Sequence, residues 1–375
     1  MSVYLDSEIG RLKRVVVHSP GAEIERMTPA SARQLLYHDI IPISVVSGEH
    51  EKLKAFLSQV AEVYELRDLL RAVIDTTGEA KAAIVRSIAP DPRAGELIRL
   101  GADELLETII GGLPVRRDTL TEYLSDRLYD IPPLPNLYFM RDGAMVYRDR
   151  VLIGAMAHRV RTNESLLLKA AFSYVPQLGS GGVMFDGVLE GGGDVSLEGG
   201  DFMPVGRNTV LVGVSERSST EATDRLAQNL TETFAEPFTL FAVMLPHEPS
   251  TIHLDMVFTI VDHGRALVYG PYVTGAEQLR VVRLDVEPGR PARIRDVDGL
   301  LEGLREVGVE LEPIFCGGEN PVYQQREQWM SGTNVLAFAP GKMIGYDCNV
   351  ATAEACAAAG FTVRPVEAFL SGEEH

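Results

Sequence analysis

The chain has 375 residues, with 35 Lys or Arg against 53 Asp or Glu, and its formal net charge is −18. Such an excess of acid argues against nucleic acid or an anionic membrane surface as the main partner. The hydrophobic content of 45% is that of a globular protein, and no apolar run approaches the ~18 residues that span a bilayer. Three cysteines without a CxxC pair, behind an N-terminus unlike a signal peptide, predict a reducing cytoplasmic location.

The N-terminal part predicts a mixture of strands and helices. Val15–His18 is a strand that ends at the turn "SPG", a helix follows around residues 50–59, and Val63–Leu66 is a second strand. Between residues 68 and 130, apolar residues recur at three- and four-residue spacing in short segments separated by Gly and Pro. This pattern predicts an all-helical insertion within a single α/β domain that spans residues 1–375.

Beyond "IPPLPN", the order strand, turn, strand, helix recurs. Three copies are "MVYRDRVLIGAMAHRVRTNESLLLKAAF", "TVLVGVSERSSTEATDRLAQNL" and "NVLAFAPGKMIGYDCNVATAEACAAAG". Self-similarity on this scale indicates a radial or stacked array of small β/α units. A doubly wound sheet is the alternative, but it predicts a GxGxxG or P-loop turn after an early strand, and the sequence contains neither.

Four short segments combine charged and apolar residues: "PNLYFMRD", "LEGGDFMPVG", "VGVSERSS" and "IHLDMVFTIVD". Alternation in the last predicts a strand over residues 252–262, in which His253 and Asp255 share one face. Each segment alone fits a surface ion pair, a polar turn or a structural histidine. Together they place several carboxylates in apolar surroundings, which a bound guanidinium would satisfy. Since HxH and HExxH patterns are missing, we expect no metal site.

These segments carry a resemblance to a known family. With "EIGRLKRVVVHSPG" and "REQWMSGTNVLAFAPGKMIGYDCN" they make six segments, in the family's order, over nearly the whole chain. The chain resembles the arginine deiminases of the guanidine-modifying hydrolase and amidinotransferase superfamily. The resemblance implies a five-bladed β/α propeller of pseudo-fivefold ββαβ units. It also implies hydrolysis of L-arginine to L-citrulline and ammonia through a cysteine thiouronium, without a cofactor.

The resemblance assigns a role to each site residue in turn. Asp142 and Asp255 resemble the pair that grips the guanidinium, and His253 resembles the general acid and base. Glu198 resembles the carboxylate that orients this histidine. The residues that correspond to ligands of the substrate's α-carboxylate are Asn136, Arg161 and Arg217. Asp201 follows in the same motif as a supporting or turn residue.

The expected nucleophile does not lie where the family has it. The family's cysteine lies in a Gly-rich loop some tens of residues beyond "IGYD", and this sequence ends before such a loop. Cys316, in "FCGGENP", is the nearest substitute, but it is interpreted as a packing residue, as are Cys348 and Cys356. We therefore expect an arginine deiminase chain that lacks its C-terminal segment and is itself inactive.

Other interpretations of the same residues stay open. The protein could bind arginine without turnover, or a partner chain could supply the missing loop. A related enzyme, an amidinotransferase or an agmatine deiminase, is a further alternative. The residues assigned to bind the substrate's α-carboxylate favour free arginine over agmatine, which lacks that group. The expected partner is the small molecule L-arginine, and a homo-oligomer is compatible with the sequence.

Overall fold

The computed structural model describes residues 2–90 and 93–372, and these form two compact units along the chain. Unit 1 contains Lys13–Ala144 and His158–Ser180, and unit 2 contains Val3–Leu12, Met145–Ala157 and the chain from Gly181 onward. Within the described ranges, no helix has the length and apolar character needed to cross a membrane.

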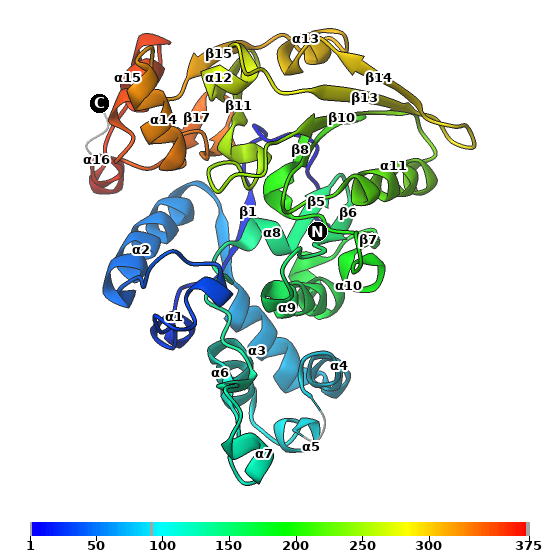
Figure 1. The fold of residues 1–375 in the computed structure, drawn as a ribbon, viewed down its shortest axis with the longest axis vertical. Helices are drawn as coiled ribbons and strands as arrows, with labels where there is room; N and C mark the ends of the chain where they lie inside the picture. The colour runs from blue at the N-terminus through cyan, green and yellow to red at the C-terminus, as the bar shows by residue number, and fades with distance from the viewer. Residues whose placement is uncertain (1, 91–92, 373–375) are drawn as a thin grey trace. The chain divides into compact units, whose positions relative to one another are not determined.

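Unit 1 pairs a small parallel sheet with a group of helices (Figure 1). Its elements in chain order are β1 (Arg14–Val17), α1 (Ala22–Glu25), η1 (Arg33–Leu35), α2 (Ile43–Val60), β2 (Glu62–Glu65), α3 (Leu66–Thr76), α4 (Gly78–Ile88), α5 (Ala94–Leu97), α6 (Ala102–Gly111), β3 (Leu113–Pro114), α7 (Leu120–Tyr123), β4 (Tyr129–Ile131), α8 (Met140–Gly143), η2 (Arg159–Arg161), α9 (Thr162–Tyr174) and η3 (Pro176–Leu178).

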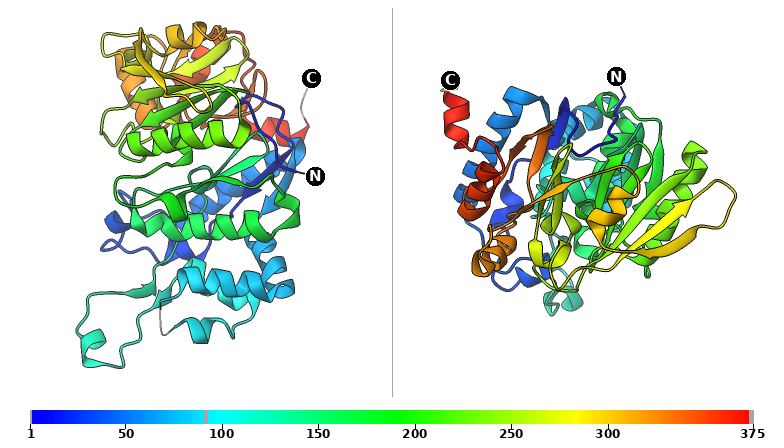
Figure 2. Two further views of the ribbon diagram at one scale, coloured as in Figure 1. Left: turned by 90° about the vertical axis from the view of Figure 1, so that its right-hand side faces the viewer. Right: turned by 90° about the horizontal axis from the view of Figure 1, so that it is seen from above.

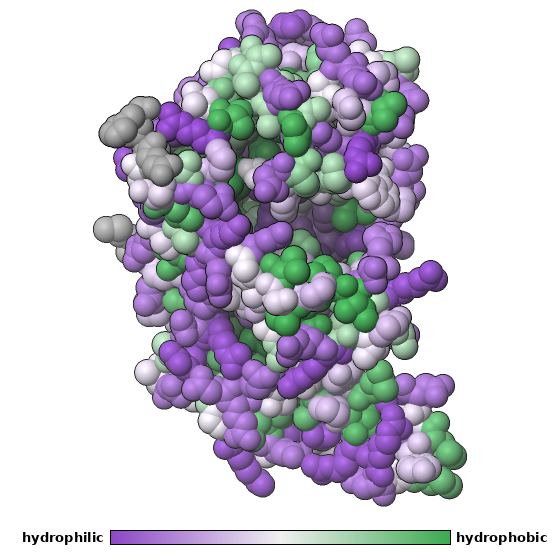
Figure 3. Space-filling model, turned by 90° about the vertical axis from the view of Figure 1, so that its left-hand side faces the viewer, coloured by the Kyte–Doolittle hydropathy of each residue, from purple (hydrophilic) through white to green (hydrophobic). Residues whose placement is uncertain are grey.

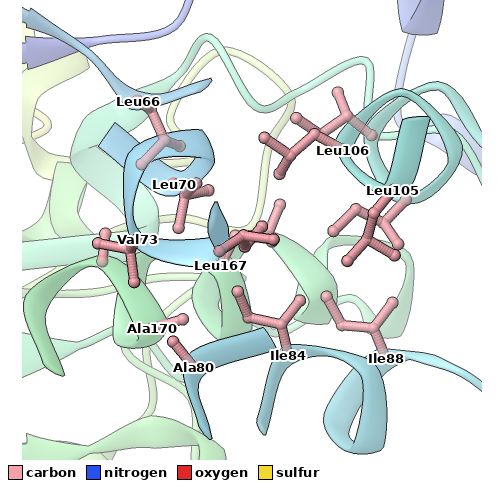
Figure 4. Packing of buried hydrophobic residues seen from close by; sticks show 14 of the residues in the cluster. Leu66, Leu70, Val73, Ala80, Ile84, Ile88, Leu105, Leu106, Leu167 and Ala170 are labelled. Atoms are coloured by element: carbon pink, nitrogen blue, oxygen red, sulfur yellow. The ribbon is translucent and has the colours of Figure 1, made fainter. Parts of the chain in front are cut away.

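The predicted helical insertion is helical over most of its length. Its apolar stripes come together with α9 in one core, which includes Leu70, Ile84, Leu105 and Leu167 (Figure 4). The segment also contains the short antiparallel pair β3–β4, so it is not purely helical. Pro114 ends β3, because proline cannot donate a further ladder hydrogen bond. The assignment of one domain over the whole chain stays a prediction.

Unit 2 consists of short sheets and covering helices, and its first strand, β5, begins at Ala144, where the segment Lys13–Ala144 of unit 1 ends. Its elements are β5 (Ala144–Tyr147), β6 (Arg150–Ile153), β7 (Val183–Asp186), α10 (Gly187–Glu190), η4 (Gly199–Asp201), β8 (Phe202–Gly206), β9 (Thr209–Val214), α11 (Thr220–Phe234), β10 (Phe238–Met244), η5 (Leu254–Met256), β11 (Phe258–Asp262), β12 (Arg265–Val268), α12 (Gly270–Val273), β13 (Val281–Val286), β14 (Arg293–Val297), α13 (Leu300–Arg305), β15 (Glu312–Phe315), α14 (Pro321–Trp329), β16 (Leu336–Ala339), β17 (Lys342–Ile344), α15 (Val350–Ala358) and α16 (Val366–Ser371).

The sheets of unit 2 repeat one pairing pattern. Strand β9 pairs antiparallel with β8 and parallel with β10, and β12 pairs antiparallel with β11 and parallel with β15. Helix α11 connects β9 to β10 and packs against their sheet (Figure 2). This is the strand, strand, helix, strand order that the repeats in the sequence predict, and the fold is mixed α/β as expected.

Both faces of the central strand β10 are buried. Leu240 and Ala242 belong to the core beneath α11, while Phe241 and Val243 belong to the core that contains Leu254. Successive side chains of a strand point to opposite faces, so the continuous apolar run "FTLFAVM" fits a strand covered on both sides. This second core anchors the segment that carries His253.

One strand prediction is wrong. Residues 252–257 do not extend β11, because Leu254–Met256 forms a 3₁₀ turn and the strand begins only at Phe258. The Leu254 N–H donates to a carboxylate oxygen of Asp201 at 2.9 Å, which takes a group that a ladder would have used. Further along the chain, residues 361–365 are irregular and lead into α16.

Most of the face seen in Figure 3 is polar, with apolar side chains gathered in a few places. Within the segment around α7, three large apolar residues are exposed: Leu120, Tyr123 and Leu124. The guanidinium of Arg117 donates to the carbonyl oxygens of Glu122 and Ser125, which orders this segment.

Candidate active site

Asp201 is the centre of a buried polar group in unit 2. Its Oδ1 accepts from the Leu254 N–H at 2.9 Å, and its Oδ2 accepts from Ser215 Oγ at 2.7 Å. The same Oδ2 lies 3.3 Å from Nδ1 of His253. An ionised carboxylate can accept hydrogen bonds but cannot donate one. This contact therefore favours the His253 tautomer that carries hydrogen on Nδ1. The other ring nitrogen, Nε2, is then the atom available for proton transfer.

Glu198 lies beside the other edge of the imidazole. Its Oε2 is 3.6 Å from His253 Nε2, beyond hydrogen-bonding distance, and it accepts from Arg217 Nη1 at 3.3 Å. Its Oε1 accepts from the Ala157 N–H at 3.0 Å. The sequence assigned the orienting role to Glu198, whereas Asp201 is the carboxylate at bonding distance from the ring. Glu198 instead supplies negative charge beside Nε2 and anchors Arg217.

Two glycines are required for this close packing. A Cβ at Gly200 would lie 2.5 Å from Cγ of His253, and a Cβ at Gly213 would lie 2.1 Å from Oδ1 of Asp201. Both distances are far below a van der Waals contact, so any larger residue would push the imidazole or the carboxylate aside. The motif "EGGD" therefore combines two acidic residues with the space that the histidine ring occupies.

Asp255 lies in the 3₁₀ turn Leu254–Met256, which His253 immediately precedes, and both residues are buried. The backbone carbonyl of Asp255 accepts from Thr333 Oγ1 at 3.0 Å. Unit 2 therefore brings together five of the residues predicted for the site: Glu198, Asp201, Arg217, His253 and Asp255.

Asp142 and Arg161 form a buried ion pair in unit 1. Arg161 Nη1 donates to Asp142 Oδ2 at 2.9 Å, and its Nη2 donates to Glu164 Oε2 at 2.9 Å. Arg161 is only 3% exposed, and a buried guanidinium needs such partners. The sequence reasoning did not include Glu164. The i, i+3 spacing of opposite charges in "RTNE", at the start of α9, could have indicated it.

Asn136 is held from the N-terminal side of unit 1. Its Nδ2 donates to the carbonyl oxygen of Leu35 at 2.9 Å, and Tyr37 Oη donates to the neighbouring Pro135 carbonyl at 2.8 Å. Burial raises the pKa of the Tyr37 phenol, which keeps this hydroxyl a donor at neutral pH. The "LLYHD" segment thus positions Asn136, a function that sequence spacing could not show.

Burial controls the chemistry of two of the three cysteines. Cys316 and Cys356 are buried, and burial raises the pKa of each thiol to about 11. Cys316 Sγ also accepts from Thr352 Oγ1. Cys348 is exposed. The thiolate is the nucleophilic form, so neither buried thiol is activated for attack.

We expect iodoacetamide to label native protein at Cys348 and to spare Cys316 and Cys356 at pH 8. With a pKa of about 11, only about one thiol in a thousand is ionised at that pH, and both sulfurs are buried. Peptide mass spectrometry with and without denaturant measures this, and all three should react once the chain unfolds. Rapid native labelling of Cys316 would contradict the packing role and make it a candidate nucleophile.

Comparison with known proteins adds the family. The family model described as arginine deiminase matches residues 113–369, which cover "PNLYFMRD", "EGGD" and "HLD". The chain belongs to the arginine deiminase family.

Individual relatives agree with this assignment. The arginine deiminase of Lactococcus lactis subsp. lactis (strain IL1403) is 30% identical, and the alignment covers 97% of this chain and 93% of the relative. The arginine deiminase of Listeria welshimeri is 32% identical, with 96% and 93% covered. Among solved structures, an amidinotransferase from Microseira wollei matches with a TM-score of 0.53 at 14% identity, covering 96% of this chain and 90% of that one. At that identity the likeness concerns the fold alone, a mixed α/β fold shared with the amidinotransferases.

Proposed function

We propose that this protein hydrolyses L-arginine to L-citrulline and ammonia. The observation that carries the proposal is the imidazole of His253, held at Nδ1 by Asp201, with the Glu198 carboxylate beside Nε2. Two carboxylates beside one imidazole stabilise its protonated form, and a histidine so held can donate and accept a proton in turn. Membership of the arginine deiminase family supports arginine as the substrate.

The reaction exchanges one C–N bond for a C–O bond. A nucleophile adds to the guanidinium carbon, and His253 protonates the departing nitrogen as ammonia. The same imidazole then takes a proton from water, whose oxygen adds to the carbon and becomes the ureido oxygen of citrulline. The bond between the carbon and the nucleophile breaks in this step, and the nucleophile is regenerated. The thiolate that resemblance to the family implies is not assigned to any of the three cysteines here. The proposal for this chain's residues therefore concerns binding and proton transfer.

The remaining site residues are proposed to bind the substrate. Asp142 and Asp255 accept hydrogen bonds from the guanidinium, because paired carboxylate oxygens match its planar N–H groups. Arg217 and Arg161, together with Asn136, bind the α-carboxylate. The ion pairs of Arg217 with Glu198 and of Arg161 with Glu164 hold both guanidinium groups in place before substrate arrives.

A five-bladed arrangement of the ββαβ units is proposed as the finer description of the fold. The repeated pairing of β8–β9–β10 and β11–β12–β15 supports it, as does the hairpin β16–β17 followed by α15. A cytoplasmic location and a homo-oligomer remain predictions from the sequence.

Incubation with L-arginine tests this proposal against the expectation of an inactive chain. Turnover should release citrulline and ammonia in equal amounts, and the kcat/KM for agmatine should be lower by roughly 10²-fold or more. Sites that pair a substrate's polar group reject an analogue that lacks it, because their own polar groups are left unpaired. Colorimetric detection of the ureido product and coupled detection of ammonia measure both reactions.

A second function, arginine binding without turnover, is favoured by one observation: the two buried thiols are not ionised at neutral pH. Isothermal titration with arginine separates the two functions. Binding without citrulline would support the second, and the absence of both would refute both.

A further inference from the structure

Helix α14 buries two adjacent polar residues. The helix is largely polar and exposed, yet Glu327 and Gln328 are 5% and 3% exposed. Buried polar groups destabilise a fold unless hydrogen bonds satisfy them. The partners of these two side chains therefore show what the end of this helix does.

Glu327 fixes α14 to the next helix. Its Oε1 accepts from the Ala351 N–H at 2.8 Å, and its Oε2 accepts from the Thr352 N–H at 2.7 Å. These N–H groups belong to the first turn of α15, which has no intrahelical partners for them and favours a negative charge. The carboxylate thus caps α15, so α14 ends at a defined place.

Gln328 reaches in the other direction, to the segment that carries His253. Its Nε2 donates to the carbonyl oxygens of Ser250 and Met256, the latter at 3.2 Å. An amide NH₂ has two hydrogens, and here each has a carbonyl acceptor. The two carbonyls lie on either side of His253 and Asp255 in the sequence, so a single side chain ties both ends of this segment.

Thr333 adds a second contact from the same part of the chain. Its Oγ1 donates to the Asp255 carbonyl at 3.0 Å, and the residue is fully buried. On the other side, Asp201 holds the Leu254 N–H and the imidazole. The turn Leu254–Met256 and His253 before it, here named the catalytic turn, are therefore held between Asp201 on one side and Gln328 and Thr333 on the other.

We infer that Gln328 is a positioning residue for His253 and Asp255, acting through the backbone carbonyls of Ser250 and Met256. The expected effect on turnover rests on the proposed function. The expected effect on the geometry of the His253 imidazole does not, because that geometry can be measured without substrate. Without the amide, two partly buried carbonyls lose their donor and the turn is free to shift, and a shift of about 1 Å in a catalytic group can lower the rate by roughly 10²-fold.

The test compares Gln328→Leu with Gln325→Leu. Leucine has a similar size but no donor, and Gln325 is an exposed residue of the same helix. Three quantities are measured: the melting temperature, kcat and KM for citrulline formation, and the ¹⁵N imidazole spectrum, with the His253 signals assigned from a His253→Gln variant. In Gln328→Leu, we expect kcat to fall roughly 10²-fold and the His253 signals to lose their Nδ1–H pattern. Gln325→Leu should match wild type in both.

A purely structural role would give a different result. If Gln328→Leu melts earlier but keeps wild-type kcat and wild-type His253 signals, the positioning role is refuted. Should that variant fail to fold, Gln328→Met removes the same donor with an unbranched side chain of similar length, and unchanged kcat and His253 signals in it would refute the inference as well. If wild type makes no citrulline, the proposed function fails separately, and the imidazole spectra of the variants still decide the positioning role.

Discussion

Replacing His253 by alanine is expected to lower kcat for citrulline formation by roughly 10² to 10⁴-fold, the contribution typical of a positioned acid–base group. The imidazole is the group in this site that can both donate and accept a proton near neutral pH, and Asp201 directs its Nε2 outward from the shared hydrogen bond. Steady-state kinetics with L-arginine measure the effect. Arginine affinity should change much less, because the substrate's charge is bound by other side chains.

The matched control is His263→Ala, since His263 is an exposed histidine at the end of β11. That variant should keep wild-type kcat. Asp201→Asn, tested in the same assay, should show part of the loss, because an amide offers a donor where Nδ1–H needs an acceptor. Activity of His253→Ala within threefold of wild type would remove His253 from the mechanism. Full activity of Asp201→Asn would return the orienting role to Glu198.

Replacing Asp142 by asparagine is expected to weaken arginine binding by roughly 10- to 150-fold. That corresponds to about 1.5–3 kcal/mol, the usual contribution of a hydrogen bond to a charged group. The variant keeps the shape of the side chain and removes the charge proposed to face the substrate guanidinium. Arg161 retains its bonds to Glu164, so unit 1 should stay folded. Isothermal titration with arginine at constant salt gives the dissociation constant directly.

Two controls separate substrate contact from local structure. Asp118→Asn changes an exposed acidic residue of the same unit and should bind arginine as wild type does. Glu164→Gln loosens Arg161 without touching Asp142, so it should weaken arginine more than agmatine, which lacks the α-carboxylate. Wild-type arginine affinity in Asp142→Asn would show that this carboxylate serves only its ion pair with Arg161.

In the structure, the two carboxylates of "EGGD" make different contacts. Sequence order alone cannot distinguish Glu198 from Asp201 as the partner of His253, because the two residues are separated by only two glycines. The 3₁₀ turn Gly199–Asp201 resolves this by directing Asp201 toward the Leu254 N–H and His253 Nδ1. Glu198, just before that turn, accepts from Arg217 and the Ala157 N–H, and its Oε2 lies 3.6 Å from His253 Nε2.

The fold class, the β/α repeats, most helices of the insertion and the charged segments could be predicted from the sequence. These follow from periodicity and local motifs: the apolar spacing of α3 and α4, the recurring order of strand, turn, strand and helix, and the four segments that combine charged and apolar residues. Such signals are local, so they survive without knowledge of what lies across the fold.

The conformation of the catalytic turn depends on hydrogen bonds to residues far away in the sequence, so it could be seen only in the tertiary structure. The alternation of apolar and polar residues predicts a strand through His253, because a local pattern contains no information on hydrogen-bond partners that are distant in the sequence. In the fold, Asp201 takes the Leu254 N–H, and Gln328 takes the Ser250 and Met256 carbonyls. Once side chains far away in sequence satisfy those backbone groups, a ladder is no longer needed and the chain can turn. Gln328 was missed for the same reason, since its role depends on contacts that no local pattern specifies.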